Sequence, residues 1–248
     1  TVAEWRQLSA AYRAEGKSIG VVPTMGALHA GHVSLFDEAR RNCDVVVATL
    51  FVNPTQFDES TDFENYPRTD EADREKMAAA GVDVLFMPDV AEMYPSGTNY
   101  TVQEDEFSQE LCGAHRPGHF TGVLTVVMKL LQIIGADRAY FGEKDYQQLQ
   151  LIRGMTKAFF LETEIVPCPT VREPDGLAMS SRNVRLSSEE RALAPQFHAI
   201  LNSAPDAPTA EQQLRDAGFK VDYIEDQTDR RFGAVRLGST RLIDNVSR

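Results

Sequence analysis

Apolar residues near the start of the chain predict a strand, a helix and a second strand. Ser18–Val22 is a short apolar run that ends at Pro23, and a glycine-containing turn leads from it into the amphipathic stretch Val33–Arg41. The run Val45–Val52 that follows is apolar almost without alternation. A strand that is covered on both faces in a parallel sheet has this pattern. We therefore predict a β-turn-α-β unit in this part of the chain.

Amphipathic and apolar stretches keep alternating after this unit. Three further pairs, each a helix candidate followed by a strand candidate, are Asp70–Ala80 with Val82–Met87, Thr121–Ile134 with Arg138–Phe141, and Tyr146–Phe160 with Thr163–Val166. Helices that alternate with strands are typical of an α/β fold with a doubly wound, Rossmann-like parallel sheet. Ligands of such sheets bind at the carboxyl ends of the strands, and we expect the site there.

Prolines interrupt this alternation near residue 170. Pro167, Pro169 and Pro174 predict a boundary between a domain over residues 1–170 and a smaller C-terminal α+β domain over residues 171–248. In the second part Ser187 and Glu190 have the spacing of a capping box, which predicts a helix that runs towards Leu201. A loop, a helix and two short strands are expected after it, over Ser203–Pro208, Thr209–Ala217, Val221–Ile224 and Ala234–Leu237.

Composition narrows the classes of function. Lys and Arg total 25 against 37 Asp and Glu, and the net charge of −12 opposes non-specific binding to nucleic acid. The chain has no run of about 18 apolar residues, so we expect no membrane span. The first residues, with Glu4 and Arg6 around Trp5, do not resemble a secretory signal, and we expect a cytoplasmic protein.

Cysteines and histidines give no metal-binding pattern. Cys43, Cys112 and Cys168 are scattered without a CxxC pair, which predicts reduced thiols in the core rather than disulfides or zinc ligands. A zinc site at His115 and His119 would lack a third ligand at a suitable spacing, so we predict none there.

The turn after the first strand carries the first candidate chemistry. Its sequence, PTMGALHAGH (23–32), places His29 and His32 three residues apart at a predicted helix start. The N–H groups and dipole at a helix N-terminus favour phosphate, imidazoles can donate to phosphoryl oxygens, and glycine lets a nucleotide approach the backbone. A helix cap beside a core histidine would read the same way. The strand-turn-helix context favours the phosphate site.

A second polar loop follows the proline-marked boundary. Ser180 and Ser181 offer hydroxyls and Arg182 a guanidinium, and these groups suit a triphosphate. Such a run is more often a solvated loop. Its occurrence in the same chain as the HxGH turn favours a nucleotide site.

These two elements resemble the HIGH and KMSKS signatures of the adenylate-forming nucleotidyl-transferase superfamily, and longer motifs are similar to those of the pantothenate synthetase family. The similarity runs from about Gly16 to Asn183 and resumes weakly at TRLIDN (240–245), after a stretch that is shorter than the family usually has. The other matching stretches are FVNPTQF (51–57), YPRT (66–69), RPGHFTGVLTVVMKLL (116–131), FGEKDYQQL (141–149) and VREPDGLAMSSRN (171–183).

The resemblance implies roles for individual residues. Residues that match ATP-binding positions are Met25, Gly26, Ala27, Leu28, His29, Ala30, Gly31, His32, Gly142, Glu143, Lys144, Asp145, Val171, Met179, Ser180, Ser181 and Arg182. Among them His32 matches the proton donor, Val171 an adenine contact and Met179–Arg182 a mobile phosphate loop, and catalytic roles are implied for His29, His32, Lys144 and Arg182. Gln56 and Gln148 match pantoate-binding glutamines, Gln56 also being assigned to β-alanine. Asp73 matches a carboxylate near magnesium.

Side-chain chemistry makes the glutamine and lysine assignments reasonable. A glutamine amide offers both donors and an acceptor, so Gln56 and Gln148 can orient a hydroxy acid without neutralising its nucleophilic carboxylate. Without the resemblance Gln56 would be a turn residue after Pro54, and Gln148 would lie on the polar face of a helix. Lys144 could be a solvated partner of Asp145, but its place beside a strand end favours a phosphate role.

The implied reaction joins pantoate to β-alanine with ATP and Mg²⁺. The pantoate carboxylate attacks the α-phosphorus, pyrophosphate leaves, and the amine of β-alanine then displaces AMP. The resemblance implies that the larger domain binds ATP and pantoate, that the smaller one is a lid carrying the Ser-Ser-Arg loop, and that the protein is a homodimer. Two rivals are another HIGH-type transferase, such as a pantetheine-phosphate adenylyltransferase, and a catalytically idle nucleotide-binding module. The two glutamines disfavour the first, and intact HxGH, Lys144 and Ser-Ser-Arg elements disfavour the second.

Overall fold

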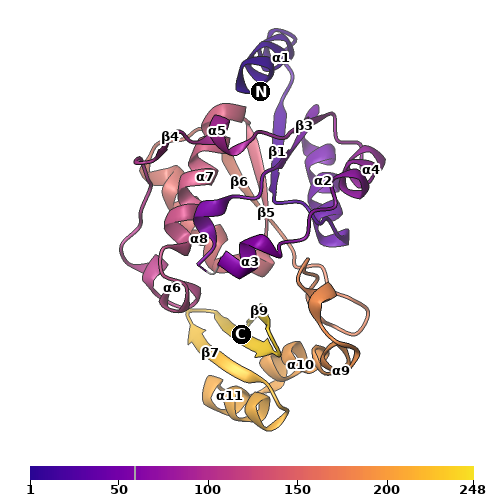
Figure 1. Ribbon diagram of the computed structural model, residues 1–248, viewed down its shortest axis with the longest axis vertical. Helices are drawn as coiled ribbons and strands as arrows, with labels where there is room; N and C mark the ends of the chain where they lie inside the picture. Colours follow the sequence, from indigo (N-terminus) through magenta and orange to yellow (C-terminus); the bar gives the residue numbers. More distant parts are fainter. Residues whose placement is uncertain (59) are drawn as a thin grey trace. The chain divides into compact units, whose positions relative to one another are not determined.

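The computed structural model describes residues 1–58 and 60–248 and contains two compact units (Figure 1). The first unit comprises Thr1–Glu143 and Gln147–Cys168, and the second comprises Lys144–Tyr146 and Pro169–Arg248. The main division therefore falls after Cys168, while the prolines predict a boundary after residue 170. The short segment Lys144–Tyr146 belongs with the C-terminal part of the chain.

A parallel five-stranded sheet organises the first unit and confirms the predicted α/β fold. Its strand order is β3-β2-β1-β5-β6, so the chain moves outward from β1 in one direction and later resumes on the other side of β1 with β5. The strand order reverses between the paired strands β1 and β5. The carboxyl ends of these two strands are therefore the topological switch point, where open α/β sheets bind their ligands. The strands are β1 (Ile19–Thr24), β2 (Val45–Leu50), β3 (Val84–Phe86), β5 (Arg138–Gly142) and β6 (Glu164–Cys168).

Helices cover both faces of this sheet. On one face, Phe36 of α2 and Met77 of α4 pack against residues of the strands. The helix α7 contacts β1 on the other face (Figure 1). All residues of β2 are buried, which explains why its sequence is apolar without alternation. The helices are α1 (Val2–Ala14), α2 (Ala30–Asn42), α3 (Ser60–Glu64), α4 (Asp70–Ala79), α5 (Val90–Met93), α6 (Cys112–His115), α7 (His119–Ile134) and α8 (Tyr146–Ala158), with 3-10 turns η1 (Pro54–Gln56), η2 (Phe107–Gln109) and η3 (Glu143–Asp145) and a short strand β4 (Pro95–Thr98).

The second unit is an antiparallel sheet with helices, as the predicted α+β class requires. Its strands pair in the order β7-β8-β9, and Phe197, Leu201, Leu214, Val235 and Leu242 lie in its core. The elements are η4 (Asn183–Arg185), α9 (Ser188–Leu193), α10 (Pro195–Ser203), α11 (Ala207–Asp216), β7 (Lys220–Gln227), β8 (Arg230–Leu237) and β9 (Thr240–Ser247).

The sequence-based prediction was wrong about one helix of this unit. The capping box of Ser187 and Glu190 is present, but the helix that it starts ends at Leu193, and α10 begins at Pro195. Proline has no N–H to donate to the preceding turn and its ring clashes with that turn's carbonyl, so the predicted continuous helix divides into two.

Candidate active site

The HxGH turn leaves the carboxyl end of β1 through two residues in the left-handed region. Gly26 has a φ of +83° and Ala27 a φ of +51°. A Cβ atom at Gly26 would also lie 3.1 Å from Asp73 Oδ2, so both the conformation and the close approach favour glycine. Leu28 is buried among the apolar residues of α2, α4 and the sheet, which fixes the turn to the core.

A buried carboxylate from α4 holds this turn. Asp73 is 0% exposed, and its Oδ2 and Oδ1 accept hydrogen bonds from the backbone N–H groups of Ala27 (2.7 Å) and Leu28 (2.8 Å). Thr69 Oγ1 donates to Asp73 Oδ2 at 3.0 Å, and Lys76 Nζ donates to the Leu28 carbonyl at 2.7 Å. Asp73 therefore stabilises the left-handed turn by binding two successive N–H groups.

Two histidines cap α2 in a way that fixes the role of their ring nitrogens. His29 Nδ1 accepts from the N–H of Gly31 at 3.1 Å, and His32 Nδ1 accepts from the N–H of His29 at 3.3 Å. The ring centroids are 4.2 Å apart. Because an accepting imidazole nitrogen carries no proton, the neutral rings carry theirs on Nε2. Both Nε2 atoms are therefore donors at the N-terminus of a helix.

Gln56 lies in η1, just beyond the carboxyl end of β2. Its Oε1 accepts from Asn53 Nδ2 at 3.0 Å, and its Nε2 lies 3.2 Å from Met25 Sδ. Asn53 is 1% exposed, and its Oδ1 accepts from Tyr94 Oη at 2.7 Å. The Gln56 amide is thus oriented by a buried network and touches Met25, a residue of the HxGH turn.

Residues that the sequence does not single out for this purpose hold the backbone of Gln56. Its carbonyl accepts from His119 Nδ1 at 2.7 Å and from the Arg116 guanidinium at 3.3 Å. Arg116 Nε in turn donates to Asp58 Oδ1 at 2.8 Å. Burial raises the pKa of Asp58, but the Arg116 guanidinium outweighs it and holds that pKa below its ordinary value. Arg116 and His119 therefore support Gln56. The sequence marks both residues only as members of the stretch 116–131, which is similar to the family.

Other predicted residues of the first unit follow β5. Gly142 ends that strand, Glu143 begins η3, and Gln148 lies, partly buried, in the first turn of α8. Parallel strands end at one edge of a sheet, so these residues, the HxGH turn and Gln56 all belong to the edge of the sheet where β1, β2 and β5 end.

The second unit contains the remaining predicted residues. The side chain of Lys144 is 18% exposed, and its Nζ lies 3.8 Å from Asp145 Oδ2. Val171 accepts a hydrogen bond from the N–H of Met179 at 3.0 Å, closing a hairpin that leads into Ser180, Ser181 and Arg182. Ser180 Oγ accepts from the N–H of Arg182 at 3.2 Å.

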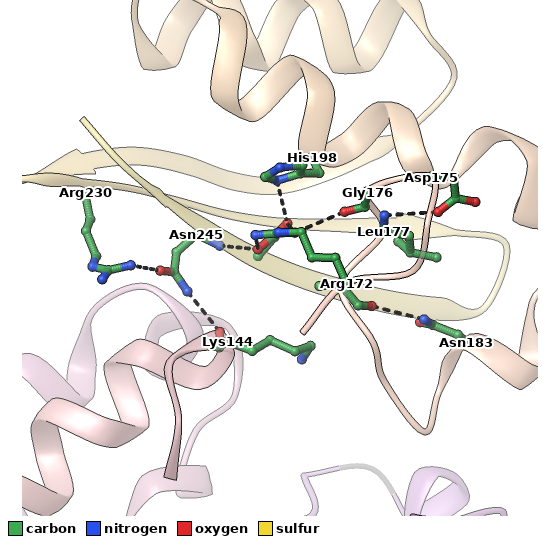
Figure 2. A network of polar contacts seen from close by, with 11 residues as sticks. Lys144, Arg172, Asp175, Gly176, Leu177, Asn183, His198, Arg230 and Asn245 are labelled. Carbon is green, nitrogen blue, oxygen red and sulfur yellow. Dashed lines mark hydrogen bonds and ion pairs between the residues drawn. The ribbon is translucent and has the colours of Figure 1, made fainter. Parts of the chain in front are cut away.

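Buried polar residues of β9 contact both of these segments, and the sequence does not predict them as functional. Asn245 Nδ2 donates to the Lys144 carbonyl at 3.0 Å (Figure 2), and the Arg172 guanidinium donates to the carboxylate of Asp244. In the sequence, only the weak similarity of TRLIDN (240–245) to the family marks Asp244 and Asn245.

The predicted state of the cysteines is confirmed. Cys43, Cys112 and Cys168 are all buried and form no disulfide. Burial raises the pKa of the Cys168 thiol to about 11. No group of three or more His, Cys, Asp and Glu side chains is arranged to bind a metal in the part of the chain that the structure describes. Nor is any helix within residues 1–58 and 60–248 both long and apolar enough to cross a membrane.

The parallel sheet, its switch point and the histidine pair at a helix N-terminus define a HIGH-type nucleotide-binding α/β protein. The family model described as pantoate-beta-alanine ligase matches residues 1–247, and the chain belongs to this family.

Similar proteins and structures bear out this assignment over nearly the whole chain. The pantothenate synthetase of Bdellovibrio bacteriovorus is 52% identical over 234 residues, covering 94% of this chain and 93% of that protein. A crystal structure of the Francisella tularensis pantoate-beta-alanine ligase, complexed with beta-gamma ATP and beta-alanine, has a TM-score of 0.92 and 41% identity, covering 98% of this chain and 95% of that one. The crystal structure of pantothenate synthetase from Thermus thermophilus has a TM-score of 0.91 and 43% identity, covering 100% of this chain and 97% of that one.

Proposed function

We propose that this protein uses ATP to condense pantoate with β-alanine through an enzyme-bound pantoyl adenylate, releasing pyrophosphate and AMP. Membership of the pantoate-beta-alanine ligase family supports the overall reaction. The observation that carries the adenylation step is the pair of Nε2 donors on His29 and His32 at the start of α2, beside the switch point of the sheet.

In the first step an oxygen of the pantoate carboxylate bonds to the α-phosphorus of ATP, and the bond from that phosphorus to the pyrophosphate oxygen breaks. Negative charge grows on the leaving pyrophosphate. The Nε2–H of His32 stabilises this charge by donating a hydrogen bond, and the N-terminus of α2 stabilises it through its dipole and free N–H groups. The family resemblance also assigns Lys144 and the Ser180, Ser181 and Arg182 groups to phosphates of ATP.

Glutamine amides suit the acid substrate. Gln56 and Gln148 orient pantoate by hydrogen bonds that leave its carboxylate negatively charged and nucleophilic. In the second step the uncharged amine of β-alanine attacks the acyl carbon, a C–N bond forms, and the bond from that carbon to the AMP oxygen breaks. The amine loses a proton as the amide forms. Closure of the Met179–Arg182 loop would keep water from the mixed anhydride.

Magnesium enters this proposal as part of the MgATP co-substrate. Asp73 does not fit as a direct ligand of that ion, because it is fully buried and its two oxygens already accept three hydrogen bonds, from Ala27, Leu28 and Thr69. We assign Asp73 instead to the conformation of the HxGH turn.

The remaining elements of the proposal concern the setting of the enzyme. We propose a cytoplasmic homodimer on the family resemblance, with pantoate, β-alanine and ATP as its small-molecule partners. The net charge of −12 supports the expectation that nucleic acid is not a partner.

Isotope exchange between pyrophosphate and ATP tests the proposed function. Exchange should require pantoate but not β-alanine, because adenylation precedes attack by the amine. Exchange that depends on pantetheine phosphate would favour the rival transferase. No exchange or pyrophosphate release with any of these acids would favour the idle nucleotide-binding module, and exchange that needs β-alanine would reject a separate adenylation step.

A further inference from the structure

Two adjacent polar residues of β9, Asp244 and Asn245, are buried within the second unit. Each is 4% exposed. Successive residues of a strand face opposite sides of a sheet. Asp244 is on the side of Leu242 and Val246, which belong to the apolar core, and Asn245 is on the other side. A carboxylate on the core side is costly to bury unless it is paired and hydrogen-bonded. The partners of Asp244 therefore indicate its role.

The chief partner of Asp244 is the guanidinium of Arg172. Its two terminal nitrogens donate to Asp244 Oδ2 at 2.6 Å and to Oδ1 at 2.9 Å, in a bidentate pair. His198 Nδ1 lies 3.2 Å from Oδ2, and the N–H of Asn245 donates to Oδ1 at 2.8 Å. Burial raises the pKa of Asp244, but its contacts with His198 and Arg172 outweigh burial and hold that pKa below its ordinary value. Asp244 is therefore ionised at neutral pH.

Arg172 lies at the base of the hairpin that carries the Ser-Ser-Arg loop. It forms a β-bridge with Ala178, and its guanidinium also donates to the Gly176 carbonyl at 3.2 Å. Val171 and Met179, the next residues on the two arms, are joined by a backbone hydrogen bond of 3.0 Å. By holding Arg172, Asp244 fixes the position from which Met179–Arg182 extends.

On the opposite side of β9, Asn245 holds the segment that contains Lys144. Its Nδ2 donates to the Lys144 carbonyl at 3.0 Å, and its Oδ1 accepts from the Arg230 guanidinium at 2.6 Å. Arg230 in turn lies over the ring of Tyr146, 3.9 Å from its centroid. The contacts of Asn245 and Arg230 thus bind both ends of the three-residue segment Lys144–Tyr146.

The geometry points to Asp244 and Asn245 as a pair of positioning residues for adenylation, which set Lys144 and the Met179–Arg182 loop at a fixed separation. This inference rests on the proposed function, in which both segments serve the phosphates of ATP. Because the two side chains leave neighbouring residues of one strand, any shift of one held segment relative to the other must break a contact with β9. Neither residue needs to touch a substrate for this role.

Asp244→Asn tests the inference, with Asp222→Asn as a matched control. Asp222 is also a largely buried carboxylate of the second unit and pairs with two arginines, Arg241 at 2.8 Å and Arg236 at 3.6 Å, but these contacts join strands and hold neither segment. For Asp244→Asn we expect pantoate-dependent exchange of pyrophosphate into ATP to fall by about 10- to 10²-fold, the scale of a misplaced catalytic group. Amide formation from supplied pantoyl adenylate should stay within about threefold, since no pyrophosphate leaves in that step. Asp222→Asn should keep both half-reactions within the same range of about threefold.

A second variant keeps the test decisive if Asp244→Asn does not fold. Arg172→Lys retains a cation opposite Asp244 but cannot make the bidentate contact and also reach Gly176, so its exchange should fall by about tenfold while amide formation is kept. Equal losses in the two half-reactions of folded variants, or undiminished exchange, would overturn the positioning role. If the wild-type protein itself shows no pantoate-dependent exchange, the proposed function fails instead.

Discussion

The two units hold their candidate phosphate-binding segments by different means. In the first, Asp73 binds the backbone N–H groups of Ala27 and Leu28, within the HxGH segment itself. In the second, Asp244 binds the side chain of Arg172, at the base of the hairpin before Met179–Arg182. The first segment is thus fixed along its own backbone, and the second is fixed only where it begins.

This difference suits a preformed site and a closing loop. A helix N-terminus stabilises an anion only if its N–H groups already point at the ligand, so the HxGH turn benefits from a rigid support. A loop that covers the substrate must move while its base stays in place, and support at Arg172 permits that. The partners differ in charge as well, since Asp73 binds neutral donors whereas Asp244 binds a guanidinium.

The largest effect is expected for Lys144→Ala, which removes the cation from a residue whose backbone carbonyl Asn245 binds. Adenylation should slow by about 10²- to 10³-fold, on the scale of losing one preorganised charge-stabilising donor. Single-turnover formation of the adenylate measures this, and thermal unfolding should show an unchanged fold. Near-normal adenylation would show that Lys144 is only a surface partner of Asp145.

The next effect concerns the support of the first unit. Asp73→Asn replaces one accepting oxygen by an NH₂ group, leaving one backbone N–H of the turn without its acceptor. We expect adenylation to fall by about 10- to 10²-fold and the free energy of unfolding to fall by about 1–3 kcal/mol. Asp70→Asn, on the exposed first residue of the same helix, is the control and should change neither quantity. An Asp73 variant with normal adenylation would separate the conformation of the turn from catalysis.

Gln148→Ala tests a residue that takes part neither in the contacts of Asp73 with the HxGH turn nor in those of Asp244 with Arg172. Removing a hydrogen-bond partner should weaken pantoate binding by about 1–3 kcal/mol, which is about 5- to 150-fold in Kd. ATP binding should be nearly unchanged, because the amide is assigned to the acid and not to the nucleotide. Calorimetry that finds ATP weakened and pantoate unaffected would reverse the assignment.

The smallest effect should be a difference in acid stability that comes from Asp244. Its pKa in the folded protein lies below the ordinary value of 3.8, so its ionised form stabilises the fold above that value. This contribution is lost as the pH falls through the folded-state pKa. Wild-type protein and Asp244→Asn should therefore differ in unfolding free energy at pH 5, and this difference should shrink as the pH falls below about 4. A constant difference down to the lowest pH would show that the pair with Arg172 does not perturb this carboxyl.

Local patterns were enough to predict the parallel sheet and the HxGH turn. The almost entirely apolar sequence of β2 indicates a strand covered on both faces, and Gly26 with His29 and His32 indicates a polar turn at a helix start. Each signal lies within a few neighbouring residues, and the structure has the elements where these patterns place them.

The supports could not be predicted in the same way, because they join residues that are distant in the sequence. Asp73 reads as one of several acidic residues in the first turn of a helix, and only the fold brings it to Ala27 and Leu28. The strand β9 was missed since Asp244 occupies a core position where alternation would place an apolar residue. The surrounding motif marks these residues, but their roles follow from contacts.

The central claim is that the turn held by Asp73 presents His32 to the departing pyrophosphate, and His32→Ala tests it most directly. A donor at that place acts more on the transition state than on bound ATP. Adenylation should fall by about 10²-fold or more, with a smaller change in ATP affinity.

The decisive measurement supplies chemically made pantoyl adenylate to the His32→Ala variant and follows amide formation with β-alanine. The variant should recover much of the wild-type rate, because attack by the amine expels AMP and involves no pyrophosphate. If instead both half-reactions fall equally in a folded variant, His32 positions the adenylate or supports the structure, and its role towards the leaving group is wrong.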